Sequence, residues 1–501
     1  MGLKAEAAKI FSKINFKYEQ KWIQNPVETQ HRVFRLLISE AKNTAFGIDH
    51  RFDSIKDYND FKDNVPVRDY EGLKSYIDRA VAGEPDVLWK GKPIYFAKTS
   101  GTTSGSKFIP ITKESMPTHI RSARNALLDY IHQKGNSDFV SGKMIFLQGS
   151  PELNEKSGIK TGRLSGIVAH YVPKYLQKNR LPSFETNCID DWETKVDKIV
   201  EETMNENMTL ISGIPPWLVM YFEKLIEKSG KNSIREIFPN LGLLVTGGVN
   251  YNPYREKMIH LIGDDPDVIQ TYPASEGFFG YQDRIGADDL LLLLDNGIFY
   301  EFISAEEFFD ENPNRISIEE VETHKDYVMI ISTTAGLWAY NIGDTVRFTS
   351  LKPYRIAVSG RIKHYTSAFG EHVIAHEVEQ ALEQALESFQ AEISEFTIAP
   401  QVNPVEGLPY HEWLIEFSAL PVDLDGFSKA IDSNLRKLNT YYDDLISGNV
   451  LRSLVITQVC KNGFNVYMKS LGKLGGQNKT PRLSNDRKIA DEFYKLNLIR
   501  K

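Results

Sequence analysis

The chain has 501 residues, and 59 Lys and Arg against 67 Asp and Glu give it a net charge of −8. This length exceeds what one hydrophobic core usually organises, so we expect two or more domains. Apolar residues at 41% and charged residues at 25% exclude a disordered or fibrous chain. The negative net charge excludes a general attraction for nucleic acid or anionic membranes. Any site that binds an anion must therefore be local.

Helical patterning dominates from about residue 5 to 90, where apolar residues recur at spacings of three and four between charged ones. This spacing predicts a layer of N-terminal helices. It is carried by Ile10, Phe11, Ile14, Val33, Leu36 and Leu37.

From there to about residue 350, short apolar runs bounded by Gly and Pro alternate with helical stretches, which is typical of an α/β fold with a largely parallel sheet. The predicted strands lie at 144–147, 241–245, 268–269 and 328–332, and the predicted helices at 192–205 and 217–228. Two further apolar runs, 290–294 and 298–303, flank Asp295-Asn296-Gly297 and predict a buried β-hairpin.

The pattern changes after about residue 360 and predicts a small α+β lobe. We therefore expect a large domain over 1–360 and a small C-terminal domain over 361–501. The lobe's predicted helices are 375–389 and 424–446, and its predicted strands lie near 396–399, 413–417, 454–459 and 464–468.

A loop dense in glycine and hydroxyl groups, Thr-Ser-Gly-Thr-Thr-Ser-Gly-Ser-Lys at 99–107, directly follows an apolar stretch at 94–97. Its glycines allow backbone N–H groups to approach an anion, and its hydroxyls and lysine can donate to phosphate oxygens. An ordinary P-loop is excluded, because three residues rather than four separate the glycines. A solvated linker is the alternative, which the apolar segments on both sides disfavour. The loop predicts a nucleoside triphosphate ligand, held by Ser100, Gly101, Thr102, Thr103, Ser104 and Lys107.

Four later segments suit other parts of ATP. Thr246-Gly247-Gly248 follows a predicted strand and lets backbone amides approach a flat heterocycle, on which Tyr272 can stack. Glu276 suits Mg²⁺, which needs only one or two carboxylates. Asp344 can accept hydrogen bonds from both ribose hydroxyls, and Arg361 can reach the ribose from the other side. Taken singly, Asp344 is more typical of a turn and Tyr272 of a core.

The order of these segments resembles that of the adenylate-forming enzymes, the superfamily of acyl-CoA ligases, luciferases and peptide-synthetase adenylation domains. Within it, the chain is most similar, over nearly its full length, to the Gretchen Hagen auxin-responsive acyl-acid amido synthetases. Asn341 departs from the Arg usual in that family, and Pro273 lies inside the Tyr-x-x-Ser-Glu segment. The segments that carry the similarity are 99–107, 272–276, 340–344, 360–371 and 476–482.

The resemblance implies an α/β fold, with a large domain of mixed, mostly parallel sheets and a β-barrel-like part. It also implies a mobile C-terminal lid, hinged near 360–366 at Lys363. In the implied reaction a carboxylate attacks the α-phosphorus of ATP, pyrophosphate leaves, and an amine then converts the acyl-adenylate to an amide and AMP. The implied catalytic residues are Lys107, Glu276 and Lys479, with Glu276 on Mg²⁺. The implied nucleotide-binding residues are Ser100, Gly101, Thr102, Thr103, Ser104, Thr246, Gly247, Gly248, Tyr272, Ser275, Asp344 and Arg361.

Two of these assignments have an alternative. Lys479 also suits a solvated basic tail, although its Gly-Gly-Gln context favours catalysis. Trp217 and Tyr221 resemble residues that line the acyl pocket, but they equally suit an ordinary core helix that begins with two prolines.

The sequence therefore predicts a ligase that uses ATP and Mg²⁺ to adenylate a small carboxylic acid and conjugate it to an amino acid. The alternatives are coenzyme A as the acceptor and a nucleotide-binding sensor without turnover. The two cysteines, Cys188 and Cys460, lie far apart and exclude a disulfide framework, which favours a reducing cytoplasm. We expect no nucleic-acid or membrane partner, and the sequence does not indicate the oligomeric state.

Overall fold

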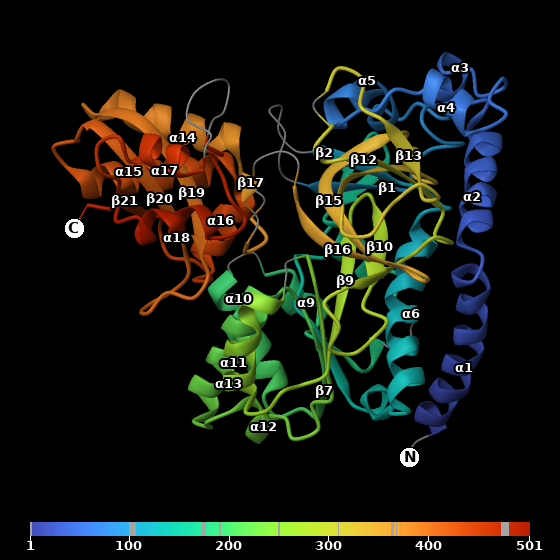
Figure 1. Cartoon of the computed structure of the whole chain (residues 1–501). Helices are drawn as coiled ribbons and strands as arrows, with labels where there is room; N and C mark the ends of the chain where they lie inside the picture. The colour runs from blue at the N-terminus through green and yellow to red at the C-terminus, as the bar shows by residue number, and fades with distance from the viewer. Residues whose placement is uncertain are drawn as a thin grey trace.

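The computed structural model describes residues 3–99, 107–172, 177–189, 192–248, 251–308, 310–361, 365–366, 368–371, 373–471 and 480–500. It is a mixed α/β structure in which a large part, built on a twelve-stranded sheet, lies beside a smaller C-terminal part (Figure 1). In the part of the chain so described, no helix has both the length and the apolar character needed to cross a lipid bilayer.

The predicted N-terminal helical layer is confirmed, and α1 packs beside α6 along one flank of the molecule (Figure 1). α2 buries Val33 and Leu37 as its apolar spacing suggests, whereas α1 leaves Ile10 and Ile14 exposed. Helix starts are fixed by side-chain caps, such as Asp57 ahead of α4. The helices of this layer are α1 (Leu3–Ile23), α2 (Pro26–Ala41), α3 (Ala45–Asp49), α4 (Tyr58–Asn64), α5 (Tyr70–Val81) and α6 (Met116–Lys134).

The large sheet is parallel in one half and antiparallel in the other, so the expectation of a mostly parallel sheet holds only for the first half. The parallel strands, in spatial order, are β6 (Arg180–Leu181), β3 (Lys143–Phe146), β7 (Met208–Ser212), β8 (Leu243–Gly247) and β9 (Val268–Ala274). The antiparallel half continues from β9 with β10 (Gly277–Tyr281), β11 (Leu290–Leu292), β16 (Tyr354–Arg361), β15 (Tyr340–Leu351), β14 (Asp326–Thr333), β12 (Ile298–Ser304) and β13 (Arg315–Ser317).

A second, four-stranded sheet carries the hydroxyl-rich loop, because β1 (Tyr95–Thr99) and β2 (Lys107–Ile111) flank it. Its outer strands are β5 (Ile159–Gly162) and β4 (Asn154–Lys156). The predicted helices at 192–205 and 217–228 are confirmed as α10 and α11, which pack together near the parallel half of the large sheet. The helices of this region are η1 (Asp138–Ser141), α7 (Leu164–Ala169), α9 (Phe184–Asn187), α10 (Trp192–Thr203), α11 (Pro215–Ser229), α12 (Ile234–Ile237), η2 (Asn252–Tyr254) and α13 (Arg255–Ile262).

The predicted hairpin over 290–303 is wrong, since β11 pairs with β10 and β16 while β12 pairs with β13 and β14. The connecting backbone is held instead by the buried side chain of Gln30 on α2. Its Nε2 donates to the carbonyls of Leu294 and Ile298 at 2.8 and 2.9 Å, and its Oε1 accepts from the N–H of Tyr300 at 2.9 Å. A tertiary partner therefore overrides the local turn signal.

The C-terminal α+β lobe is confirmed, but its boundary at residue 361 stays a prediction. The segment 464–468 is helical rather than a strand, because Phe464 and Tyr467 both turn towards Phe493 at the helical spacing of three. The predicted helix 424–446 is interrupted at Asn439. The elements are β17 (Tyr365–Thr366), β18 (Val373–Ile374), α14 (Ala375–Ser388), β19 (Glu392–Gln401), β20 (Tyr410–Ala419), α15 (Leu424–Leu438), α16 (Thr440–Ser447), β21 (Val455–Gln458), α17 (Gly463–Ser470) and α18 (Lys488–Lys495).

Apolar side chains of the C-terminal part and of the α10–α13 region form one continuous core. Polar contacts reinforce the join: Arg163 forms an ion pair with Asp444 at 2.5 Å and lies 4.7 Å from the ring of Tyr441. The hydroxyl of Tyr254 donates to the carbonyl of Ala368 at 2.9 Å. No sequence motif marks these residues, so the sequence alone does not predict this join.

Candidate active site

Tyr272 and Asp344, which the sequence assigned to adenine and ribose, are joined by a hydrogen bond. The hydroxyl of Tyr272 on β9 donates to Oδ2 of Asp344 on β15 at 2.5 Å, and the Asp344 side chain is buried. Three strands, β10, β11 and β16, lie between β9 and β15 in the sheet order. In a flat sheet the two strands would be about 19 Å apart, at ~4.8 Å per strand, so the sheet must curl strongly here. This curl supports the barrel-like part that the family resemblance implied.

Arg361 lies next to Asp344 in the same ladder, because β15 and β16 pair these two residues directly. Backbone pairing thus places Gly343-Asp344 beside Gly360-Arg361. This proximity agrees with the prediction that Asp344 and Arg361 both contact the ribose.

The Thr246-Gly247-Gly248 turn lies at the carboxyl end of β8, beside β9. Gly247 faces Thr271, whose hydroxyl donates to the carbonyl of Thr246 at 2.9 Å. A Cβ on Gly247 would lie 2.5 Å from Thr271 Oγ1 and 2.8 Å from its carbonyl oxygen, so only glycine fits. Gly248 has a φ of +78°, which favours glycine again. The carboxyl ends of parallel strands are where α/β folds bind ligands.

Glu276 lies at the tip of a tight turn, since Ala274 and Gly277 pair across the β9–β10 hairpin with Ser275 and Glu276 between them. Both turn residues are half-buried. The hairpin places Glu276 four residues after Tyr272, the residue whose hydroxyl contacts Asp344. A single carboxylate in such a place suits Mg²⁺, which retains most of its waters.

Lys107 begins β2, opposite Thr99, so both ends of the hydroxyl-rich loop are fixed by strand pairing. Its ammonium lies 5.6 Å from the ring of Tyr70, whose hydroxyl accepts from the Phe108 N–H at 2.9 Å. Burial raises the pKa of Tyr70, so this hydroxyl stays neutral.

The segment just before Tyr70 ties the loop's base to the strand that carries Asp344. The N–H of Arg68 donates to the carbonyl of Ala339 at 3.0 Å, and its carbonyl accepts from the N–H of Asn341 at 2.7 Å. The hydroxyl-rich loop and the Asp344 carboxylate are therefore connected through residues 68–70. The sequence alone does not predict this connection, because no motif accompanies the Arg68-Asp69-Tyr70 segment.

The two predicted acyl-pocket residues lie in different environments. Trp217 is half-buried in the first turn of α11, and the preceding Ile214 lies 3.5 Å from the Cβ position of Gly248. The helix therefore begins beside the Gly-Gly turn. Tyr221 is fully buried between α10 and α11, where its hydroxyl shares a 2.6 Å hydrogen bond with Thr203. This position matches the core-helix alternative, and a role for Tyr221 at an acyl group stays a prediction.

The remaining predicted residues lie outside the described part of the chain. They are Ser100, Gly101, Thr102, Thr103 and Ser104 of the loop, Lys363 of the hinge, and Lys479. For Arg361, the backbone in β16 is described and the side chain is not.

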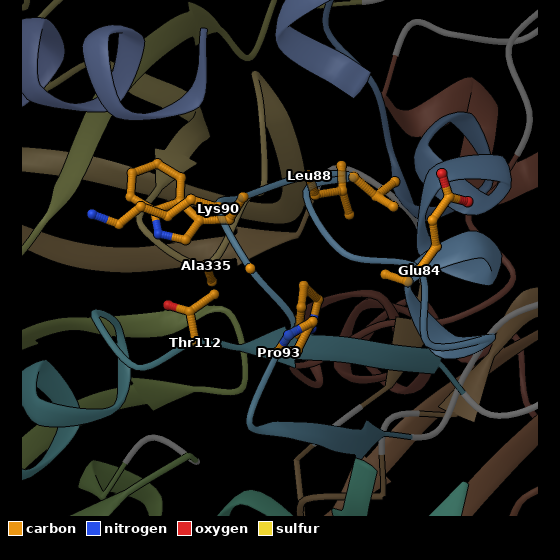
Figure 2. A pocket seen from close by; sticks show the side chains of 11 residues that line it. Glu84, Leu88, Lys90, Pro93, Thr112 and Ala335 are labelled. Carbon is orange, nitrogen blue, oxygen red and sulfur yellow. The ribbon is translucent and has the colours of Figure 1, made fainter. Parts of the chain in front are cut away.

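A small pocket elsewhere does not compete with this site. Figure 2 shows it beside β2, with Glu84 towards one end and Lys90 towards the other. Its volume of ≈ 10 Å³ suits about one water molecule, and none of the predicted nucleotide residues lines it.

Three family models match successive parts of the chain. Models of the GH3 family match as an N-terminal domain over residues 17–189 and 177–266, a central domain over 291–361 and a C-terminal domain over 376–488. The chain belongs to the GH3 family. The resemblance to the Gretchen Hagen family is thereby confirmed.

Curated GH3 relatives are named as amido synthetases. A jasmonoyl-L-amino acid synthetase, JAR4 of Nicotiana attenuata, is 22% identical over 64% of this chain and 66% of its own length. The indole-3-acetic acid-amido synthetase GH3.15 of Arabidopsis thaliana is 26% identical over 58% of this chain and 60% of its own. The chain thus spans less than two thirds of these two relatives. A jasmonoyl-L-amino acid synthetase of Oryza sativa, GH3.5, is 23% identical over 91% of both chains.

Solved structures support the GH3 fold over the whole chain. The AtGH3.15 acyl acid amido synthetase in complex with 2,4-DB has a TM-score of 0.62 at 17% identity, covering 98% of this chain and 96% of that one. A 2-hydroxyisobutyryl-CoA ligase in complex with 2-HIB-AMP and CoA has a TM-score of 0.58 at 14% identity, covering 94% and 91%. At these identities the likeness concerns the fold.

Proposed function

We propose that this chain is an ATP-dependent acyl-acid amido synthetase, which adenylates a small carboxylic acid and transfers the acyl group to an amino acid. The observation that carries the proposal is the contact between Tyr272 and Asp344, with Arg361 next to Asp344 in the ladder. Separate motifs that suit adenine and ribose thus meet in one place, in a family whose curated relatives are named amido synthetases.

In the first step, an organic carboxylate must approach an α-phosphate that is already anionic, so charge neutralisation and alignment dominate the barrier. Lys107 and the amides of the loop it ends serve this purpose. Tyr272 and Asp344 hold the nucleoside, which fixes the direction of the phosphates. A Mg²⁺ ion on Glu276 would neutralise further phosphate charge, and one half-buried carboxylate is enough to bind it, since Mg²⁺ retains most of its waters.

In the second step, the acyl-adenylate must be kept from water until an amine attacks its carbonyl and AMP leaves. A reorientation of the C-terminal part about Lys363, bringing Lys479 to the site for one of the two steps, provides this separation. The join through Arg163 and Asp444 is partly exposed, and such contacts are worth at most ~1 kcal/mol each. This ion pair therefore adds little resistance to a reorientation, which must also separate part of the apolar core that the C-terminal part shares with the α10–α13 region.

The test is exchange of labelled pyrophosphate into ATP, measured with a broad panel of carboxylic acids that includes indole-3-acetic and jasmonic acids. Exchange that depends on an acid is expected, and Lys107→Ala or Glu276→Ala should abolish it. Lys98→Ala, an exposed lysine on the neighbouring strand, is the matched control and should exchange normally. Absence of exchange with every acid would reject the proposal.

The acceptor is identified by adding amino acids or coenzyme A to the same reactions. Amide formation supports the proposal, whereas formation of a thioester alone would identify coenzyme A as the acceptor. Coenzyme A is included because the fold is similar to that of a 2-hydroxyisobutyryl-CoA ligase. Binding of ATP without pyrophosphate release would select a sensor. A cytoplasmic location is part of the proposal, supported by two free cysteines, Cys188 and Cys460.

A further inference from the structure

The first helix presents apolar side chains to solvent. On α1, Ile10 is 62% exposed, Ile14 59%, Tyr18 50% and Phe11 43%. The spacing of four aligns Ile10, Ile14 and Tyr18 in one row along the helix, and Phe11 lies beside that row. We call these four residues the α1 patch. Contiguous apolar surface of this kind on a folded protein marks a binding surface more often than chance exposure.

The opposite face of α1 packs on the protein and is mixed, because it buries Ala5 and Trp22 together with three polar side chains. Ser12, Asn15 and Glu19 are all at least 92% buried, and Oε1 of Glu19 accepts from Nδ2 of Asn125 on α6 at 2.9 Å. The hydroxyl of Ser137 anchors the helix further by donating to the carbonyl of Ala5 at 2.9 Å. Specific polar contacts therefore hold the α1 patch outward.

Positive charge predominates around the α1 patch. The acid beside it, Asp295, accepts from the Tyr18 hydroxyl at 3.5 Å and is paired with Arg32 at 2.8 Å. α1 carries five lysines against two glutamates, a net charge of +3, in a chain whose net charge is −8. Lys13, Lys17 and Lys21 are exposed, whereas one of the two acids, Glu19, is buried. Arg124 of α6 adds a cation 5.4 Å from the ring of Phe11. Helices that lie in the plane of an anionic membrane surface share this combination of exposed apolar residues and neighbouring lysines.

We propose that the α1 patch binds the surface of an anionic lipid bilayer, with α1 parallel to the membrane and its lysines among the headgroups. The local positive charge of α1 then overrides the expectation, drawn from the net charge of the whole chain, that the protein has no membrane partner. Charge favours this occupant over a second copy of the chain, because pairing two α1 helices would bring their lysines together. α1 runs along the flank opposite the C-terminal part (Figure 1), so membrane contact leaves the join and the nucleotide segments accessible. The GH3 match begins only at residue 17, so Ile10, Phe11 and Ile14 precede the stretch that the family model describes.

The test is cosedimentation of the full chain with vesicles of phosphatidylcholine alone, or of phosphatidylcholine and phosphatidylglycerol in equal parts. Binding is expected to the mixed vesicles only and should weaken at high salt. Lys13→Glu/Lys17→Glu should lower the partition coefficient by about 30-fold or more, since each lysine near an anionic surface contributes about fivefold.

A second double variant separates the apolar contribution. Ile10→Ser/Ile14→Ser should lower the partition coefficient by at least about tenfold, because apolar area no longer enters the interface. Val405→Ser/Val422→Ser, which alters two fully exposed valines of the C-terminal part, is the matched control and should bind like the unaltered chain. All three variants change exposed side chains, so their circular dichroism and thermal unfolding should match the parent.

Two results would overturn the proposal. One is failure of the unaltered chain to bind the mixed vesicles. The other is a dimer in sedimentation velocity that Ile10→Ser/Ile14→Ser dissociates, which would assign the α1 patch to a second copy. Neither result bears on amide synthesis, because the α1 patch contains no residue of the candidate active site.

Discussion

Replacing Tyr272 by Phe tests the contact at the centre of the candidate active site. The variant keeps the ring for stacking and removes the hydroxyl that donates to Asp344 at 2.5 Å. A hydrogen bond to a charged group is worth about 1.5–3 kcal/mol, and the Asp344 side chain is only 7% exposed, so solvent does little to replace it. If half of that value acts by orienting the carboxylate towards the ribose, the KM for ATP rises about 4- to 12-fold.

The assay is pyrophosphate exchange as a function of ATP concentration, in a double-mutant cycle with Asp344→Ala. Asp344→Ala alone should raise the KM further, and adding Tyr272→Phe to it should change little, because the hydroxyl then has no carboxylate to orient. Tyr327→Phe is the matched control. Its hydroxyl accepts from the N–H of Glu322 at 3.1 Å elsewhere in the sheet, so the KM should not change. Additive effects of the Tyr272 and Asp344 substitutions would refute the reasoning.

Three further outcomes follow from other contacts. Gly247→Ala places a methyl group 2.8 Å from the carbonyl oxygen of Thr271. We therefore expect the free energy of unfolding to fall by about 1–3 kcal/mol and the KM for ATP to rise. An unchanged melting temperature would contradict this. Burial raises the pKa of Glu19 from 4.5 to about 7. The folded state therefore holds the Glu19 proton more tightly than the unfolded chain does. The stability that this protonation gives is fully present below pH 4.5 and is lost as the pH rises through 7. Glu19→Gln should therefore flatten the fall in melting temperature over that range, and a profile parallel to the parent's would count against it. Arg163→Ala should change unfolding by no more than about 1 kcal/mol, since its pair with Asp444 is partly exposed, and should alter kcat for amide formation rather than the KM for ATP.

The sequence was sufficient where a motif carries its own chemistry. The order of the hydroxyl-rich loop, Tyr272, Asp344 and Arg361 indicated the family, and the strand ladders bring Asp344 and Arg361 together. What it could not supply is the curl of the sheet that joins β9 to β15, because that depends on pairings distant in sequence. The link through Arg68 is of the same kind, since backbone bonds to Ala339 and Asn341 leave no trace in residue identity.

Errors arose where local patterns compete with tertiary packing. The Asp295-Asn296-Gly297 turn predicted a hairpin, yet the flanking strands find partners elsewhere. Residues 464–468 have β-branched and aromatic character, but packing on Phe493 selects the helix. Apolar spacing on α1 correctly predicted a helix but not which face is buried, because the buried face combines Ala5 and Trp22 with Glu19, which accepts from Asn125.

The side chain of Gln30 has a consequence for shortened forms of this protein. It makes three hydrogen bonds to main-chain groups at Leu294, Ile298 and Tyr300, where the chain passes from β11 to β12. In a polypeptide that lacks α1 and α2, those main-chain groups would have no partner in Gln30. The unpaired strand edge could then form hydrogen bonds with another molecule. Deletion of the amino-terminal residues through α2 would therefore favour aggregation over a shorter folded protein.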